Sequence, residues 1–190
     1  VEGAENLVGR SPRALKTNTV GDWLKTANPR SKVYSVAIKG RAAVLLGGKM
    51  ADRALWFDNL STGYISSDYY GKTFPEWASG ISGKVTLADD LAKGWSKKYG
   101  DEMYTQSRED RNQYEMGSFL PDFPHTLDRM RPGLPDGSKP GMFFTTSPFG
   151  DKLTLTMARK VMEVQRLGKD KHTDILFVGC SVADYIGHHF

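Results

Sequence analysis

The sequence lacks the features of disulfide-linked, membrane-spanning and repetitive proteins. Its 190 residues include one cysteine, Cys180, which cannot form an internal disulfide. Its longest apolar run, over 174–181, is strand length, whereas a membrane helix needs roughly 20 apolar residues. Internal repeats, low-complexity segments and long Lys/Arg runs are also missing. These absences exclude a disulfide scaffold, a membrane span and a repeat array.

The composition that remains is that of an ordinary folded domain. Hydrophobic residues make up 39% of the chain and charged residues 25%, which excludes a disordered or collagen-like protein. A chain of this length buries a sizeable core without a disulfide or a structural metal. We therefore predict a single domain over residues 1–190.

The net charge of +4 is unevenly distributed. Residues 1–53 hold ten Lys/Arg against four Asp/Glu, whereas residues 54–190 hold sixteen against eighteen. The basic residues of the first quarter alternate with apolar residues and Gly, which is not typical of a nucleic-acid-binding tail. We expect a small anionic ligand there and no nucleic acid, although scattered solubilising charges would give the same pattern.

Local patterns in the first half predict short alternating elements. Thr19 precedes a capped helix that Asn28-Pro29 ends. Residues 32–38 alternate and are rich in β-branched types, which predicts a strand, followed by a loop at 39–41. Further on, the patterns predict a helix over 42–49, a hairpin of two strands over 54–58 and 63–67, and short helices over 75–78 and 87–93.

The second half predicts an irregular insertion and then a helix and a strand. Residues from about 96 to 149 are rich in Pro and lack periodicity, so we expect an irregular excursion. A helix is predicted over 150–168, and the apolar run over 174–180 indicates a strand covered on both faces of a parallel sheet. The fold class is therefore α/β, and we expect part of a doubly wound sandwich.

The sharpest candidate site follows that last strand. In open α/β sheets, ligands gather beyond the carboxyl ends of strands, which is where Asp184 and His188 are expected. If the segment is helical, these two residues share one face and offer the oxygen and nitrogen donors that suit Zn²⁺ or a similar divalent ion. The same spacing also occurs on a surface helix where Asp caps and His pairs with it.

A second candidate follows the strand over 32–38. Lys39 supplies a point charge, Arg41 supplies a planar fork for two phosphoryl oxygens, and Gly40 allows close approach of the backbone. The three residues could form an oxyanion clamp. A solvated turn is the alternative interpretation.

Other polar residues are expected to be structural. His125 lies in the irregular region and is expected to pack or hydrogen-bond, and His172 lies in a solvated loop. Ser66, Ser67 and Asp68 belong to an aromatic cluster over 66–70 that could line a pocket, but we expect mainly structural roles for them too.

Five ordered stretches carry a resemblance to a known family: 13–25, 31–42, 54–58, 67–70 and 184–188. Together they resemble the alkaline phosphatase superfamily. The nearest branch is that of the bacterial exported alkaline phosphatases with a threonine nucleophile, which are related to type I phosphodiesterases and nucleotide pyrophosphatases. The resemblance runs over nearly the whole chain, which makes it more specific than any single motif.

The resemblance implies a doubly wound α/β domain that holds two zinc ions and hydrolyses phosphate monoesters through a phosphoryl-enzyme intermediate. It implies that Lys39 and Arg41 contact the phosphoryl oxygens and that Asp184 and His188 bind one zinc. It gives His189 no role. It also implies export, to the periplasm or beyond, and a small phosphate ester as the partner. The oligomeric state stays undetermined.

The resemblance further implies an incomplete catalytic domain. The family's threonine nucleophile and several metal ligands come from stretches that would precede Val1 or follow Phe190, so we expect an internal fragment that is inactive by itself. A phosphodiesterase or nucleotide pyrophosphatase of the same superfamily, and a non-catalytic anion-binding module, remain alternatives. A clamp of two cations favours a dianionic monoester over a diester, which carries one charge.

Overall fold

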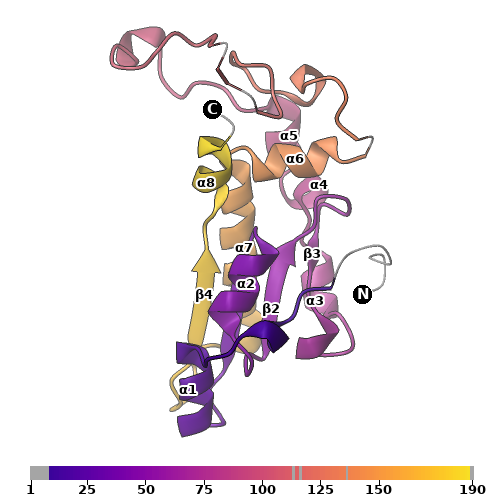
Figure 1. The fold of residues 1–190 in the computed structure, drawn as a ribbon, viewed down its shortest axis with the longest axis vertical. Helices are drawn as coiled ribbons and strands as arrows, with labels where there is room; N and C mark the ends of the chain where they lie inside the picture. The colour runs from indigo at the N-terminus through magenta and orange to yellow at the C-terminus, as the bar shows by residue number, and fades with distance from the viewer. Residues whose placement is uncertain (1–8, 113, 116, 136, 189–190) are drawn as a thin grey trace.

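The chain forms a four-stranded sheet with the strand order β3-β2-β1-β4 (Figure 1). This computed structural model describes residues 9–112, 114–115, 117–135 and 137–188. His189 lies outside these ranges. The two ends of the chain, on which the expectation of a fragment partly rests, also lie outside them. Strand β1 is parallel to β2 and β4, and β3 runs antiparallel to β2. The strands are β1 (Val33–Ala37), β2 (Arg53–Phe57), β3 (Tyr64–Ile65) and β4 (Ile175–Gly179).

Helices cover both faces of the sheet, as the α/β prediction requires. Alternate residues of β1 face opposite sides of the sheet. Val36 packs with Leu153 of α7 (Phe149–Gln165) on one side. Val33 packs with Val44 of α2 (Gly40–Gly47) on the other side. Figure 1 shows α2 and α7 on opposite sides of the sheet. All five residues of β1 are buried, which makes it the central strand of the described layer.

Strand β4 is less covered than the sequence indicated. Four of its five residues are only partly buried, and Val178 is 38% exposed. Within the part of the chain that the structure describes, β4 pairs only with β1 and forms the edge of the sheet. The apolar run predicted a strand covered on both faces, and this was wrong for the described residues because an edge strand has a neighbour on one side only.

The first helices follow their sequence signals closely. Helix α1 (Val20–Ala27) begins with a capping box, in which the Thr19 hydroxyl accepts a hydrogen bond from the Asp22 N–H and the Asp22 carboxylate accepts one from the Thr19 N–H. Helix α2 begins at Gly40, two residues earlier than predicted, with Lys39 as its N-cap. The chain therefore passes from β1 into α2 almost without a loop.

The rest of the chain contains short helices around one long one. The sequence predicted α7, the hairpin of β2 and β3, and the short helices α3 and α5, but it did not predict α4 or α6. The helices after the hairpin are α3 (Glu76–Ser79), α4 (Gly83–Thr86), α5 (Ala88–Lys93), α6 (Lys139–Thr145), α7 and α8 (Val182–Gly187), and single 3₁₀ turns lie at 12–14, 68–70, 101–103 and 127–129.

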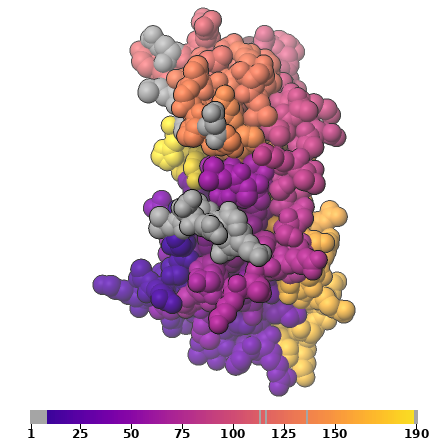
Figure 2. All heavy atoms as spheres, turned by 90° about the vertical axis from the view of Figure 1, so that its right-hand side faces the viewer, coloured from indigo at the N-terminus to yellow at the C-terminus, as the bar shows by residue number. Residues whose placement is uncertain are grey.

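Residues 96–138 are here called the irregular segment, and their described part contains two of those 3₁₀ turns and no α-helix. The segment gathers at one end of the elongated molecule (Figures 1 and 2). The arrows of β2 and β4 point toward the same end, which also carries α6 and α8. The carboxyl edge of the sheet thus faces the irregular end of the molecule. None of the helices in the described ranges is long and apolar enough to cross a membrane.

Candidate functional site

The carboxyl ends of β1 and β4 bring the two predicted motifs together. Lys39 follows β1, and Asp184 lies on α8, which follows β4. Because the two strands are parallel neighbours, these residues meet at one edge of the sheet, where Lys39 Nζ donates to Asp184 Oδ2 in an ion pair. The Tyr185 ring lies beside the ammonium group, with its centroid 4.3 Å from Nζ.

His188 stands on the same face of α8 as Asp184. Its Nε2 atom lies 3.7 Å from Asp184 Oδ1, and the two side chains are 74% and 55% exposed. The hydrogen bond from Lys39 lowers the pKa of Asp184, which keeps the carboxylate ionised. One oxygen of Asp184 thus accepts from Lys39, and the other lies near the His188 ring.

Arg41 lies on the first turn of α2 and is exposed. It is two residues from Lys39, but it does not line the cavity described below. The structure therefore brings Lys39, Asp184 and His188 into one cluster, whereas Arg41 lies exposed on the first turn of α2.

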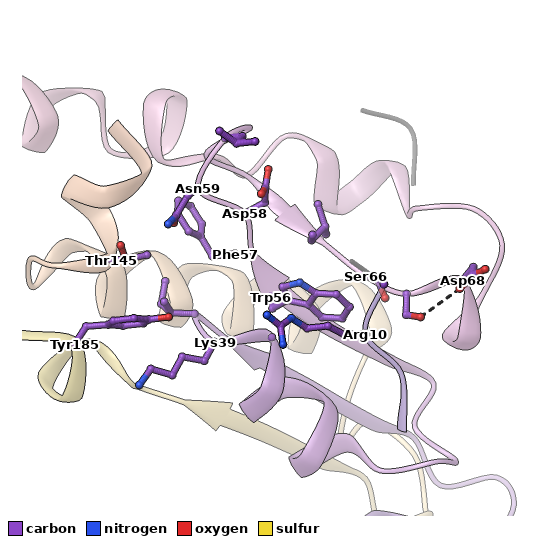
Figure 3. Close-up of a pocket in the computed structure, with 16 residues that line it drawn as sticks. Arg10, Lys39, Trp56, Phe57, Asp58, Asn59, Ser66, Asp68, Thr145 and Tyr185 are labelled. Atoms are coloured by element: carbon purple, nitrogen blue, oxygen red, sulfur yellow. Dashed lines mark hydrogen bonds between the residues drawn. The ribbon is translucent and has the colours of Figure 1, made fainter. Parts of the chain in front are cut away.

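A cavity of about 640 Å³ begins at Lys39 and runs along the carboxyl edge of the sheet toward β3. Figure 3 shows Lys39 and Tyr185 at one end, Asp68 at the other, and Trp56 with Arg10 between them. The residues that line it come from the segment before the first 3₁₀ turn, the ends of β1 and β2, the hairpin and the residues after it, α2, α6 and α8. They are Gly9, Arg10, Ile38, Lys39, Gly40, Trp56, Phe57, Asp58, Asn59, Leu60, Ile65, Ser66, Ser67, Asp68, Thr145 and Tyr185.

Two glycines let backbone and side chains close around this cavity. A Cβ atom at Gly40 would lie 2.7 Å from Arg10 Cδ and 3.0 Å from Trp56 Cδ1. A Cβ atom at Gly141 of α6 would overlap the backbone of Asn59. Both positions need a residue without a side chain for the cavity wall to keep its shape.

Sequence reasoning missed most of this cavity. Asp58 and Asn59 follow β2 in the way that Lys39 follows β1, so the ends of parallel strands were the available signal. Ser66 and Asp68 line the cavity although they were expected to be mainly structural. Tyr70, from the same cluster, is a core residue whose hydroxyl donates to the Gly48 carbonyl at 2.8 Å.

His125 and His172 make their contacts outside the cluster around Lys39. His125 is 2% exposed and packs among aromatic rings of the irregular segment, and burial lowers its pKa to about 4. His172 lies in a loop, where its Nδ1 atom is 3.1 Å from Asn28 Nδ2. The expectation of structural roles for both agrees with these contacts.

No protein-family model matches the chain. Individual proteins are similar to it in sequence. The chain is 39% identical to alkaline phosphatase PafA of Elizabethkingia meningoseptica, over 97% of this chain and 34% of that protein. It is also 35% identical to a protein of Myroides odoratus named calcium-transporting ATPase, over 99% of this chain and 35% of that protein.

The fold agrees with solved structures of PafA. Wild-type PafA matches with a TM-score of 0.82 and 36% identity, over 95% of this chain and 35% of that chain. A PafA variant matches with a TM-score of 0.83 and 34% identity, over 96% of this chain and 35% of that chain. In that variant one threonine, one asparagine, one lysine and one arginine are substituted. The resemblance predicted from the sequence is confirmed, and this α/β chain is a relative of the alkaline phosphatases that spans about a third of their length.

Proposed function

We propose that this chain is part of a metal-dependent phosphatase that hydrolyses phosphate monoesters. The observation that carries the proposal is the meeting of Lys39 and Asp184, 145 residues apart in sequence, at the carboxyl edge of the sheet. The relatives named alkaline phosphatase support phosphomonoester hydrolysis at the level of the family. Because the chain spans about a third of those relatives, the activity is proposed for a longer protein that carries these residues.

In this proposal Lys39 and Arg41 hold the phosphoryl oxygens. Asp184 and Tyr185 contact the Lys39 ammonium group and hold it in position. Arg41 is exposed two residues further along the chain and has a planar fork that can hold two oxygens of a dianionic phosphoryl group. Together they would neutralise charge that builds up on those oxygens during transfer.

The substituted PafA supports this assignment. The lysine and arginine changed in that variant are two positions apart, the spacing of Lys39 and Arg41. The threonine and asparagine changed with them precede that lysine by more than 60 positions. By that spacing, no residue of the present chain would correspond to either. We therefore propose that the phosphoryl-enzyme intermediate forms on a threonine that this chain does not supply.

Asp184 and His188 fit a divalent metal by donor type. They present a carboxylate oxygen and an imidazole nitrogen on one helix face, and both groups are accessible. Zinc sites in proteins usually take at least three protein ligands, and the described residues contain no cluster of three or more His, Cys, Asp or Glu side chains. We propose that these two residues hold zinc together with ligands outside this chain. When bound, zinc would stabilise negative charge on reacting oxygens.

Monoesters are the proposed substrates because the clamp carries two cations. A phosphate monoester brings two negative charges, whereas a diester brings one and adds a second organic group where the clamp would sit. Phosphodiester hydrolysis is the competing activity. Export to the periplasm or beyond is a further proposal, and it rests on the family resemblance.

The test is hydrolysis of p-nitrophenyl phosphate by the full-length protein, with and without added zinc. We expect Arg41→Ala to lower kcat/KM by about 100-fold or more, the usual effect of removing a donor to a developing oxyanion. Asp184→Ala should abolish zinc-dependent activity. Arg159→Ala, on the exposed face of α7 where Arg159 pairs with Glu163, is the matched control and should leave kcat/KM unchanged.

The same assay with bis(p-nitrophenyl) phosphate separates the alternatives. Faster cleavage of the diester, with Arg41→Ala nearly neutral, would replace the monoesterase proposal by a diesterase. Phosphate binding that does not depend on divalent metal, without hydrolysis, would indicate an anion-binding module.

A further inference from the structure

The cavity beside Lys39 extends away from the cluster of Lys39, Asp184 and His188. Lys39 is the only one of these three that lines it, and the far end is formed by Ser66 and Asp68 (Figure 3). A phosphate ester whose phosphoryl group is held at Lys39 can therefore place its alcohol part in this space. This step rests on the proposed function, because it takes Lys39 as a phosphoryl contact.

The charges around the cavity are balanced. Arg10 and Lys39 contribute two cations, and Asp58 and Asp68 contribute two carboxylates. A second phosphate or a carboxylate on the alcohol part would approach those carboxylates and be repelled. A neutral alcohol part fits better, with Lys39 engaged at the phosphoryl group.

The cavity wall also offers many hydrogen-bonding groups. Asp58 is only 8% exposed, and one of its oxygens accepts from the Ser61 N–H at 2.8 Å, which fixes its orientation.

Asn59, Ser66 and Ser67 also line the cavity. The Ser66 hydroxyl donates to the Ala54 carbonyl and the Ser67 hydroxyl donates to the Asp68 carboxylate, so both hydroxyls are offered to a ligand as acceptors. A purely apolar alcohol would strip water from these groups without replacing its hydrogen bonds, which costs binding free energy.

An apolar surface lies among these polar groups. Trp56, Phe57 and Ile65 line the cavity, and the C–H faces of a ring can pack against them. The volume of about 640 Å³ falls within the range of small-molecule sites, roughly 300 to 1,000 Å³. A sugar ring therefore has room there, and its hydroxyls reach the polar wall while its C–H faces meet the rings.

We propose that this cavity is a subsite for a neutral, polyhydroxylated leaving group, and that sugar phosphates are the preferred substrate class. The Asp58 carboxylate accepts hydrogen bonds from the sugar hydroxyls. The Asn59 amide accepts hydrogen bonds from them and also donates to them. These two residues determine specificity in the proposal and take no part in the phosphoryl transfer.

The test compares glucose 6-phosphate with hexyl phosphate in the full-length protein. Both are phosphate esters of a primary alcohol with six carbons, and only the first carries hydroxyls. We expect kcat/KM to be at least about 10-fold higher for the sugar phosphate. We expect Asp58→Asn and Asn59→Ala each to lower this preference about 10-fold, the usual effect of losing one hydrogen bond.

The ratio of the two substrates is measured on one preparation, so an unfolded fraction of a variant cancels. Asp58→Asn also keeps an oxygen that can accept from the Ser61 N–H. Asp89→Asn, at an exposed carboxylate of α5 outside the cavity, is the matched control and should keep the wild-type ratio.

Two results would overturn the proposal. If hexyl phosphate is hydrolysed as well as the sugar phosphate, or if both cavity variants keep the wild-type ratio, the subsite assignment is wrong while the phosphatase assignment stands. If neither ester nor p-nitrophenyl phosphate is hydrolysed in the presence of zinc, the proposed function and the subsite fail together.

Discussion

His188 and His125 lie in two regions that are built differently. His188 follows a regular strand-helix unit and projects from α8 into solvent beside Asp184. His125 lies in the irregular segment, where its ring centroid is 4.3 Å from that of Phe123 and 4.9 Å from that of Phe119. The regular layer is held by its backbone pairing and can leave ionisable groups at its edge. The described residues of the irregular segment form isolated bridges, such as that between Phe119 and Met130, and are held mainly by buried side chains, an imidazole among them.

Helix α6 joins the two regions through two adjacent phenylalanines. The Phe144 ring packs edge-on against Phe57 of β2, with ring centroids 6.2 Å apart. The Phe143 ring packs edge-on against Phe119 of the irregular segment, at 5.8 Å. Both side chains are fully buried. The two rings also contact each other, with centroids 5.6 Å apart, and Phe143 stacks on Phe149 of α7. We therefore expect an alanine variant of each ring to perturb one region more than the other.

The largest expected effect is that of Phe144→Ala. Removing this ring leaves a cavity beneath β2, and we expect the free energy of unfolding to fall by about 3–5 kcal/mol. Urea unfolding measures it. Phe143→Ala is the matched variant. We expect it to speed hydrogen exchange of the amides over 118–130 more than Phe144→Ala does. Equal exchange over these residues in the two variants would show that the regions unfold as one unit.

The next effect is a pH dependence from His125. Burial lowers its pKa to about 4 from the ordinary value of 6.5, so the unfolded chain binds more protons between these two pH values. The stability is fully present above about pH 6.5 and is lost as the pH falls toward 4. At 1.36 kcal/mol per pKa unit, the loss is about 3 kcal/mol.

Urea unfolding between pH 7 and pH 4 tests this, with His125→Phe as the comparison. The phenylalanine keeps an aromatic ring in the cluster and does not titrate, so the difference between the two curves isolates His125 from the carboxylates. Parallel curves would show that His125 does not couple the irregular segment to pH.

The smallest effect is expected at the opposite end of the regular layer. Thr19→Ala removes the hydrogen bond from the Asp22 N–H to the Thr19 hydroxyl, and we expect a loss of about 1 kcal/mol in unfolding free energy. Thr19→Ser keeps the hydroxyl and should recover most of it. Hydrogen exchange in the irregular segment should be the same in both variants, and a change there would contradict the separation of the two regions.

Signals that lie within a few residues were readable from the sequence. Thr19 and Asp22 marked the start of α1, and the alternation over 32–38 marked β1. Helix α6 was missed because Pro140, Gly141 and its terminal threonine are poor helix formers. Its helix depends on the packing of Phe143 and Phe144, which no local pattern reports.

The site was predicted in pieces. Lys39 and Asp184 were each identified after a strand, but their contact depends on β1 and β4 being neighbours, which is a property of the whole sheet. The exposure of β4 depends on its edge position in the same way. Asp58 and Asn59 were missed because a single polar residue after a strand is common, and only the fold shows that they share a cavity with Lys39.

Gly141 links helix α6 to the wall of the cavity through a contact between backbones. Any side chain at this position would push on Asn59, so the helix and the turn after β2 can diverge in evolution only together. A lineage that replaced Gly141 would have to move the turn, and with it the wall of the cavity that we propose as the subsite for the alcohol part. In that proposal, variation in selectivity among relatives can begin at a residue that does not line the cavity.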